Sequence, residues 1–279
     1  VVNGWEELDR LCQIVFIGSE PKICFSHRRT PEPNDLNIVP AHDLMLSSEL
    51  SQNGKIGGFY SFLKPDARMT TLLSNRGCRA QCTFCSVRNF NGVGVRRRSV
   101  QSVIDELLEL KNEHGVEHVM WLDDDFLYDA RESLHLFNEM IKHDVGLTWD
   151  CTNGVIAASC TEEVIRAAAE SGCIGLNVGM ESGNSGILKY IRKPGTIKNF
   201  LAAAEVLRNV ERINARVFLM IGFPGETYNQ IKDTIDLSWE MGLDWYNVTI
   251  LQPLPNTPIF DEMVADGLIG GINFIDMRY

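Results

Sequence analysis

Three cysteines stand close together in the segment GCRAQCTFC, where Cys78, Cys82 and Cys85 follow the spacing C-x3-C-x2-C. Thiolates at this spacing can bind a small inorganic cluster, and three is one fewer than the four that would saturate a cubane cluster or close a structural zinc site. One iron would then stay open for a substrate or a cofactor. Two other interpretations are a zinc site completed by a distant histidine and a chance grouping of buried thiols.

The zinc interpretation requires a fourth ligand, and the sequence offers none nearby. Paired C-x2-C motifs are the usual zinc pattern, and no second pair follows in this chain. Four histidines fall on expected helices or strand starts away from the cysteine segment: His114, His118, His135 and His143. Three further cysteines, Cys151, Cys160 and Cys173, are expected to be unreactive core thiols, because free cysteine is among the most buried residue types.

Composition excludes several classes of protein. The chain has 279 residues, of which 44% are hydrophobic and 23% charged, and its net charge is −11. These values favour a globular chain of barrel size over a disordered or fibrous one. The longest apolar runs, such as residues 217–221, are far shorter than the ~20 residues of a membrane span. With no recognisable signal peptide, we expect a cytoplasmic protein, and the acidic charge argues against nucleic acid as a partner.

From Met69 onward, apolar runs of strand length alternate with segments of helical periodicity. The expected strands are residues 70–75, 118–123, 147–152, 174–180, 216–223 and 245–251. The expected helices are residues 99–114, 130–144, 161–172, 197–210 and 227–242. This alternation predicts an α/β fold with a parallel sheet over residues 66–279. Residues 1–65 are expected to form an N-terminal linker or appendage with one hairpin, from CQIVFIG and KICFSH.

The carboxyl ends of strands are where such sheets carry their chemistry. Unusual residues follow five of the six expected strands: Cys78, then Asp123 to Asp125, then Thr152 and Asn153, then Glu181 and Ser182, then GFPGE at 222–226. Stability alone would not require polar residues along this edge. The edge is therefore the predicted site.

Two other segments have both a functional and a structural interpretation. The three arginines at 96–98 resemble a phosphate clamp, but bases that open a helix are more often a solvated face or an electrostatic partner of acidic surface, which we favour. The prolines of LQPLPNTP at 251–258 could shape a substrate loop or only end the sixth strand. Aromatic residues near the edge could line a pocket or belong to the core: Phe126, Trp149, Trp245 and Tyr246.

The cysteine triad with Phe84 before its third member, after an apolar strand and before the helix SVQSVIDELLEL, resembles the radical S-adenosylmethionine (radical SAM) superfamily. The resemblance covers most of residues 70–260 and implies a partial (β/α)6 TIM-like barrel. By it, Cys78, Cys82 and Cys85 hold a [4Fe–4S] cluster whose open iron binds S-adenosylmethionine. One electron would cleave the sulfonium to a 5′-deoxyadenosyl radical, which abstracts a substrate hydrogen.

The same resemblance assigns cofactor contacts along the edge. WLDDDF stands where the family has a GGE-like motif. Asp123, Asp124 and Asp125 are therefore candidates for binding the amino group of SAM. The alternative is that they form a solvated turn or cap a helix. Glu181 in GMESG matches the ribose-binding position. In MIGFPGE, Ile221, Gly222 and Phe223 match the segment near adenine. Phe84 and Asn153 complete the candidate set.

The motifs PNDLNIVPAHDL, SNRGCRAQCTFCS, GMESG, MIGFPGET and QPLPNTP resemble the branch in which a cobalamin-binding domain precedes the barrel. That branch includes methyltransferases, cyclases and ring-contracting enzymes. Nothing in the chain resembles the D-x-H-x-x-G motif, so we expect either that a cobalamin domain lies outside it or that cobalamin is not used. The end at Arg278-Tyr279 favours a fragment.

Two functions are therefore weighed. The first is a radical SAM enzyme, with methyl transfer to or rearrangement of a small-molecule or lipid precursor, supplied with electrons by a donor such as flavodoxin or ferredoxin. The second is an iron–sulfur protein for electron transfer or structure that does not use SAM. The acids and glycines along the edge favour the enzyme, since an electron carrier would not need them.

Overall fold

The computed structural model of the protein describes residues 36–44 and 67–269. The chain divides into two compact units between Glu32 and Pro33, and every described residue belongs to the second unit. The hairpin expected from CQIVFIG and KICFSH lies outside the described residues. The domain boundary expected near residue 65 stays a prediction.

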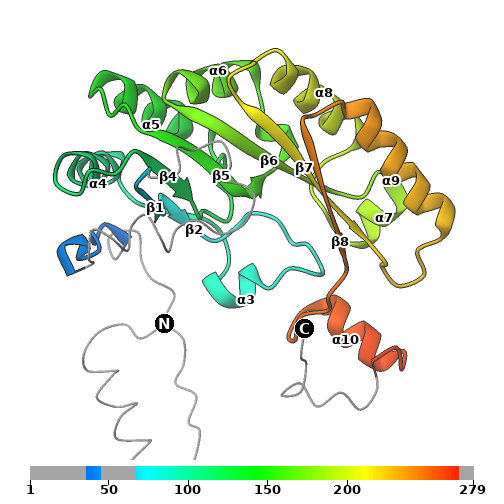
Figure 1. Cartoon of the computed structure of the whole chain (residues 1–279). Coiled ribbons are helices and arrows are strands. Elements are labelled where there is room, and N and C mark those ends of the chain that lie inside the picture. The colour runs from blue at the N-terminus through cyan, green and yellow to red at the C-terminus, as the bar shows by residue number, and fades with distance from the viewer. Residues whose placement is uncertain (1–35, 45–66, 270–279) are drawn as a thin grey trace, which may run out of the picture. The chain divides into compact units, whose positions relative to one another are not determined.

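Six parallel strands form the main sheet, in the order β1-β4-β5-β6-β7-β8 (Figure 1). Their bounds are β1 Met69–Leu72, β4 His118–Trp121, β5 Thr148–Val155, β6 Cys173–Glu181, β7 Asn214–Ile221 and β8 Trp245–Ile250. Because all neighbouring pairs are parallel, the chain must cross back between strands, and it does so through helices. Within the described residues β1 and β8 remain the two edges of the sheet. The expected partial (β/α)6 TIM-like barrel is confirmed.

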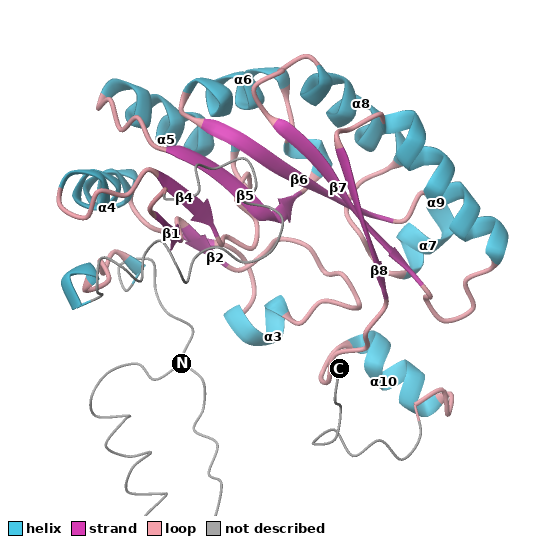
Figure 2. Cartoon of the chain, viewed as in Figure 1, coloured by secondary structure: helices cyan, strands magenta, loops and turns pink. Residues whose placement is uncertain are grey.

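Helices cover the outer face of this sheet (Figure 2). Those between the strands are α4 Val100–Asn112, α5 Ala130–Lys142, α6 Glu162–Glu170, α8 Ile197–Arg208 and α9 Tyr228–Met241. They begin where side-chain oxygens cap them: Ser99, Thr161 and Thr227 each accept a hydrogen bond from a backbone N–H in the first turn. The five helices expected from the sequence are confirmed to within about two residues at each end.

An aromatic cluster fills the core between the sheet and its helices. Trp121 stacks on Phe126 with ring centroids 4.9 Å apart, and Phe137 stacks on Trp149 at 5.4 Å. All four rings are fully buried, and each contributes about 2–3 kcal/mol through its buried area. Phe126 and Trp149 thus belong to the core and do not line a pocket. Phe126 also anchors the loop that carries the three aspartates after β4.

Several short elements complete the described fold. They are β2 Asn75–Arg76 paired antiparallel with β3 Arg96–Arg97, helices α3 Val87–Asn91, α7 Ser185–Tyr190 and α10 Pro258–Ala265, and 3-10 turns at His42–Leu44 and Ala157–Ser159. Helices α3 and α10 lie at the end of the sheet to which the strands point (Figure 1). No helix in the described part of the chain is long and apolar enough to cross a membrane.

The expectation that residues 96–98 form a solvated face at the start of a helix is wrong. All three arginines are partly buried, and the first two form β3. Arg97 donates to the carbonyl of Phe126 at 3.2 Å, and Arg98 donates to the carbonyl of Leu73 at 3.1 Å. The Nη groups of Arg97 and Arg98 thus donate to backbone carbonyls, whereas Nε of each is buried without a hydrogen-bond partner among the described residues.

Gly77 provides a test of how tightly the cysteine loop is closed. Its φ is +89°, and a Cβ added to it would lie 2.1 Å from the carbonyl oxygen of Gly94. Gly94 has a similar φ of +79° but open space around it. We expect Gly77→Ala to lower the free energy of unfolding by about 3 kcal/mol, and Gly94→Ala by about 1 kcal/mol, as measured by urea denaturation. Equal losses in the two variants would show that the close approach is not a constraint.

Candidate functional site

A cavity of about 350 Å³ lies at the carboxyl ends of the strands and collects most of the candidate residues. Its lining includes all three cysteines of the triad and comes from the loop after β1, from the ends of β4, β5 and β6, and from the segment after α7. The lining residues are Cys78, Ala80, Cys82, Phe84, Cys85, Val87, Arg88, Asp124, Asn153, Gly154, Val155, Ile156, Gly179, Glu181, Lys193 and Pro194. The sequence predicted that the carboxyl edge would be the site, and the cavity lies there.

The cysteine loop is held at both its ends and its middle. Cys78 forms an isolated bridge with Val93, which follows α3. The backbone of Thr83 donates to the carbonyl of Ile191 at 2.9 Å and accepts from the N–H of Ile259 at 3.1 Å. Ile259 lies in the first turn of α10, so the proline-containing segment after β8 both ends that strand and helps to hold the cysteine loop.

The three thiols are partly buried around the cavity. Burial raises the pKa of Cys78 to about 12 and the pKa of Cys82 to about 11, and it also raises the pKa of Cys85. The ammonium of Lys193 opposes this rise in pKa at Cys82 and Cys85, but without further positive charge among them the thiols would stay protonated near neutral pH. A bound metal centre supplies that charge and deprotonates coordinating thiols outright. This donor set fits a cluster.

A single metal ion fits less well. Among the described residues, no three or more His, Cys, Asp or Glu side chains stand close enough together to hold one ion. A tetrahedral zinc site needs four ligands at one point, whereas each cysteine of an iron–sulfur cubane binds a different iron. Three thiols spread around a cavity match the larger group.

The three aspartates after β4 have different positions. Asp123 is fully buried behind the cavity, and its carboxylate accepts hydrogen bonds from the backbone N–H groups of Ser74 at 3.0 Å and Asn75 at 2.7 Å. Asp124 lines the cavity, and its Oδ2 accepts from the N–H of Gly77 at 2.8 Å. Asp125 is buried below the loop. The structure therefore brings only Asp124 of the three to the cavity wall.

Asp125 binds the cysteine loop from beneath. Its Oδ2 lies 3.0 Å from Nε of Arg79 and 3.8 Å from Sγ of Cys78. Burial raises the pKa of Asp125, and the guanidinium of Arg79 opposes that rise. The carboxylate thus supports the first cysteine of the triad and does not face the cavity lining.

Glu181 reaches the cavity because the backbone departs from regular strand geometry there. Its φ is +66°, and the pairing of β6 with β7 shifts register between Gly179 and Glu181. Oε1 of Glu181 accepts from Nζ of Lys193 at 2.9 Å. A Cβ on Gly179 would lie 2.8 Å from the same Nζ, so a side chain at this position would displace the end of the lysine side chain. A left-handed conformation costs a non-glycine residue about 1–3 kcal/mol and is often found at functional sites.

Lys193 is a site residue that the sequence analysis missed. Burial by itself lowers the pKa of Lys193, but Glu181 and the thiols of Cys82 and Cys78 outweigh it, so the pKa is raised and the ammonium stays charged. Arg88 also lines the cavity and donates to the carbonyl of Ala80 at 3.3 Å. The only sequence signal for Lys193 was its place in RKPG, between two expected elements.

The remaining candidates divide between the cavity and its surroundings. Phe84 and Asn153 line the cavity, and the side-chain amide of Asn153 donates to the carbonyl of Leu122 at 2.8 Å. Phe223 is buried beside Phe84 with ring centroids 6.2 Å apart. Ile221, Gly222 and Phe223 are not among the residues that line this cavity. Of these three residues, Phe223 packs against Phe84, and the assignment of all three to adenine stays a prediction.

Comparison with known proteins identifies the family. The model of the Radical SAM superfamily matches residues 72–238, which is more than half of the chain. The chain belongs to the radical SAM superfamily. The matched range begins at the end of β1 and ends in α9, and it contains the cysteine triad, Glu181 and Lys193. The resemblance inferred from the sequence is confirmed.

Two enzymes from Streptomyces wedmorensis and Cereibacter sphaeroides are similar to this chain. The cytidylyl-2-hydroxyethylphosphonate methyltransferase of Streptomyces wedmorensis is 30% identical over 73% of this chain and 39% of its own length. The anaerobic magnesium-protoporphyrin IX monomethyl ester cyclase of Cereibacter sphaeroides is 26% identical over 67% of this chain and 31% of its own length. The chain therefore spans less than half of either relative.

Among solved structures, the radical SAM methyltransferase TsrM from Kitasatospora setae, with cobalamin and a [4Fe–4S] cluster bound, superposes with a TM-score of 0.65. It is 20% identical, and the match covers 72% of this chain and 40% of that one. At this identity the likeness shows the fold, and it agrees with the six-stranded parallel sheet.

The raised pKa of Asp123 predicts that the stability of the fold depends on pH. Burial raises the pKa of Asp123 from 3.8 to about 7, so the folded protein keeps a proton that the unfolded chain releases between these two values. The free energy of unfolding should therefore decrease as pH rises through about 4 to 7. We expect Asp123→Asn, which cannot ionise, to show a shallower decrease in urea denaturation across this range. Asp105→Asn on the exposed side of α4 is the control, and a slope unchanged in Asp123→Asn would contradict the assignment.

Proposed function

We propose that the protein is a radical SAM enzyme that cleaves S-adenosylmethionine at a [4Fe–4S] cluster held by Cys78, Cys82 and Cys85. The observation that carries this proposal is one cavity that combines three thiols with the buried Glu181–Lys193 ion pair. When bound, the cluster and S-adenosylmethionine would supply reductive cleavage of the sulfonium and a 5′-deoxyadenosyl radical for hydrogen abstraction. Membership of the superfamily supports the same chemistry.

The residues around the thiols suit the polar groups of the cofactor. Asp124 uses Oδ2 for Gly77 and Asn91, which leaves Oδ1 for an ammonium group. Lys193 offers a cation for a carboxylate. Glu181 uses Oε1 for Lys193, and among the described residues Oε2 has no hydrogen-bond partner that would compete with the ribose hydroxyls. In this arrangement the ammonium of the cofactor would meet a carboxylate and its carboxylate would meet a cation.

Methyl transfer is the outcome that we favour for the whole protein. It is supported by the methyltransferase relative, which is 30% identical, whereas the cyclase relative at 26% supports rearrangement as the second candidate. If cobalamin takes part, the groups that hold it would lie outside the described residues. A pure electron carrier would not need the Glu181–Lys193 pair and the cavity beside the thiols.

The class of substrate, the electron donor and the cellular compartment are inferred from this chemistry. We propose a small-molecule substrate, because the cavity is closed on several sides by the loop after β1, by β6 and by the segment after α7. Reduction of the cluster requires a one-electron donor such as flavodoxin or ferredoxin. Free thiols that must stay reduced favour a cytoplasmic setting.

The cysteine triad is tested by a pair of matched variants. We expect the protein, reconstituted anaerobically with iron and sulfide and given dithionite and S-adenosylmethionine, to release 5′-deoxyadenosine. Cys82→Ala should lose this activity by at least about a hundredfold, because the cluster loses one of its three ligands. Cys160→Ala, which alters a buried core thiol, should keep it. Chromatographic detection of 5′-deoxyadenosine is the measurement, and its absence from the wild-type protein would contradict the proposed function.

The role of Lys193 is tested through the affinity for S-adenosylmethionine. We expect Lys193→Gln to raise the KM for S-adenosylmethionine about tenfold or more, since a buried charge-assisted contact is lost. Lys232→Gln removes a lysine of similar charge from an exposed ion pair with Asp236 and should leave KM unchanged. An unchanged KM in Lys193→Gln would remove Lys193 from the binding site.

A further inference from the structure

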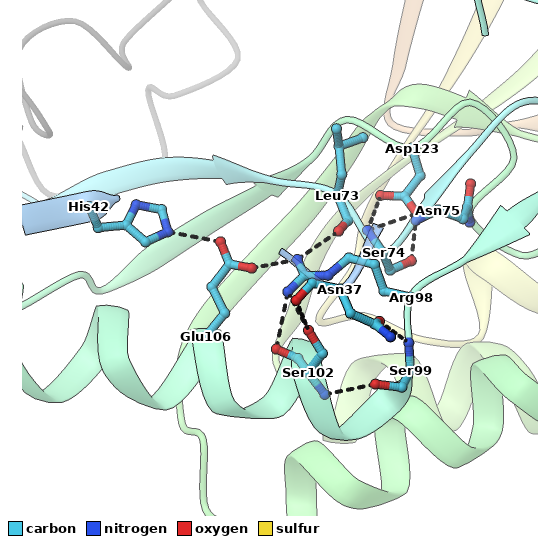
Figure 3. Close-up of polar contacts among 10 residues, drawn as sticks. All are labelled: Asn37, His42, Leu73, Ser74, Asn75, Arg98, Ser99, Ser102, Glu106 and Asp123. Carbon is cyan, nitrogen blue, oxygen red and sulfur yellow. Dashed lines mark hydrogen bonds and ion pairs between the residues drawn. The ribbon is translucent and has the colours of Figure 1, made fainter. Parts of the chain in front are cut away.

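A series of polar contacts leads from residues 36–44 past α4 to Ser74, Asn75 and Asp123, just before the cysteine loop (Figure 3). We call residues 36–44 the N-terminal strap. The strap lies against α4, and it takes no part in the lining of the cavity beside the cysteines. Nothing in the proposed chemistry uses it.

The first contact in the series is an ion pair between Glu106 and Arg98. Both side chains are buried, and a carboxylate oxygen of Glu106 accepts from Nη1 of Arg98. The other carboxylate oxygen lies 2.8 Å from Nε2 of His42 on the strap. Desolvation of a carboxylate is costly unless its oxygens are satisfied, so Glu106 depends on both partners. Figure 3 shows His42 and Arg98 on either side of the Glu106 carboxylate.

Arg98 connects Glu106 to the residues that follow β1. Its Nη1 donates to the carbonyl of Leu73 at 3.1 Å, and its own N–H donates to the carbonyl of Ser74 at 2.9 Å. Its Nη2 also donates to the carbonyl of Ser102 on α4 at 3.1 Å. One side chain therefore holds the end of β1 against α4, at the point where the cysteine loop begins.

From Ser74 the contacts continue to the first cysteine. The N–H groups of Ser74 and Asn75 hold the carboxylate of Asp123, and the side-chain amide of Asn75 donates to the carbonyl of Asp125 at 3.2 Å. Asp125 then binds Arg79 and lies 3.8 Å from Sγ of Cys78. Every member of this series is fixed by named hydrogen bonds, and Cys78 stands at its end.

The strap is attached mainly by polar contacts. Asn37 accepts from the N–H of Ser99 at 2.8 Å through its side chain and from the hydroxyl of Ser102 at 3.3 Å through its carbonyl. Between the strap and β1 lies a cavity of about 340 Å³, so the two are not closely packed against each other. The apolar side chains of Ile38 and Leu44 are exposed. Asn37 and His42 are therefore the anchors that hold the strap on α4.

We propose that Glu106, with Arg98 and the strap residue His42, is a positioning group for the cysteine loop. Docking of the strap satisfies Glu106, and Glu106 fixes the guanidinium that holds Leu73 and Ser74. These in turn place the aspartates that support Gly77 and Cys78. The inference rests on the proposed function, because the position of the loop matters to a cluster only if the loop holds one.

The test first measures hydrogen exchange in the loop and then the rate at which the cluster loses iron. In Glu106→Gln, which keeps the shape of the side chain and removes its charge, hydrogen exchange by mass spectrometry should be about tenfold faster at the backbone amides of residues 74–79. In the reconstituted protein, release of iron to a chelator in the absence of S-adenosylmethionine should also be about tenfold faster. His42→Ala should accelerate both rates in the same direction by a smaller factor, since Arg98 still faces Glu106.

Two control variants separate positioning from general loss of stability. Leu237→Ala on α9 removes buried apolar contacts near β7 and β8, at the opposite end of the sheet from β1, and is expected to lower stability without accelerating exchange at residues 74–79. Glu162→Gln makes the same chemical change as Glu106→Gln in an exposed ion pair with Arg166 and should change neither rate. If Glu106→Gln accelerates exchange at residues 74–79 no more than Leu237→Ala does, the positioning role is overturned.

A failure of the cluster assignment can be distinguished from a failure of the positioning role. A wild-type protein that retains no iron–sulfur cluster after reconstitution would contradict the cluster assignment. The exchange measurement is made on the iron-free protein and still decides whether Glu106 and His42 position residues 74–79.

Discussion

Three consecutive aspartates after β4 hold the loop that carries the cysteines, and the site depends on this arrangement. Asp123 binds the backbone at Ser74 and Asn75, Asp124 binds Gly77, and Asp125 binds Arg79 beside Cys78. A loop that follows a short edge strand has few backbone partners of its own, and carboxylates that accept several N–H donors supply them. The aromatic core around Trp121 and Phe126 fixes the aspartates in turn, so the packing behind the sheet determines where the thiols lie.

The electrostatics of the cavity follow from its burial. Burial raises the pKa values of the triad thiols and of Asp125, and the cavity also contains Asp124 and Glu181. The charged groups at such a site are stable only when cations stand among them. Lys193 is one such cation within the described residues, and a cluster with a sulfonium cofactor would add positive charge at the same place. The acidic excess near the edge is thus consistent with a cationic ligand.

Much of the fold could be predicted because its signals are local. Apolar strands, helix caps such as Ser99 and Thr227, and the spacing of Cys78, Cys82 and Cys85 are all visible within a few residues of sequence. The prediction failed for Arg98, which was expected at the surface and instead joins a buried ion pair with Glu106. Ser102 and Glu106 lie on α4 four and eight positions away, but Leu73 lies 25 positions away, and no local pattern reveals that contact.

The sequence by itself determined the family resemblance and the location of the predicted site: three cysteines with the spacing of a cluster-binding triad, placed at the carboxyl edge of a parallel sheet. It did so because cysteine spacing and strand periodicity are properties of neighbouring residues. Only the tertiary structure decided which of three adjacent aspartates faces the cavity, and that Lys193 pairs with Glu181 there. The direction of a side chain at a strand end depends on register shifts, on positive φ angles such as that of Glu181, and on partners from other strands. Those are long-range interactions that no single segment contains.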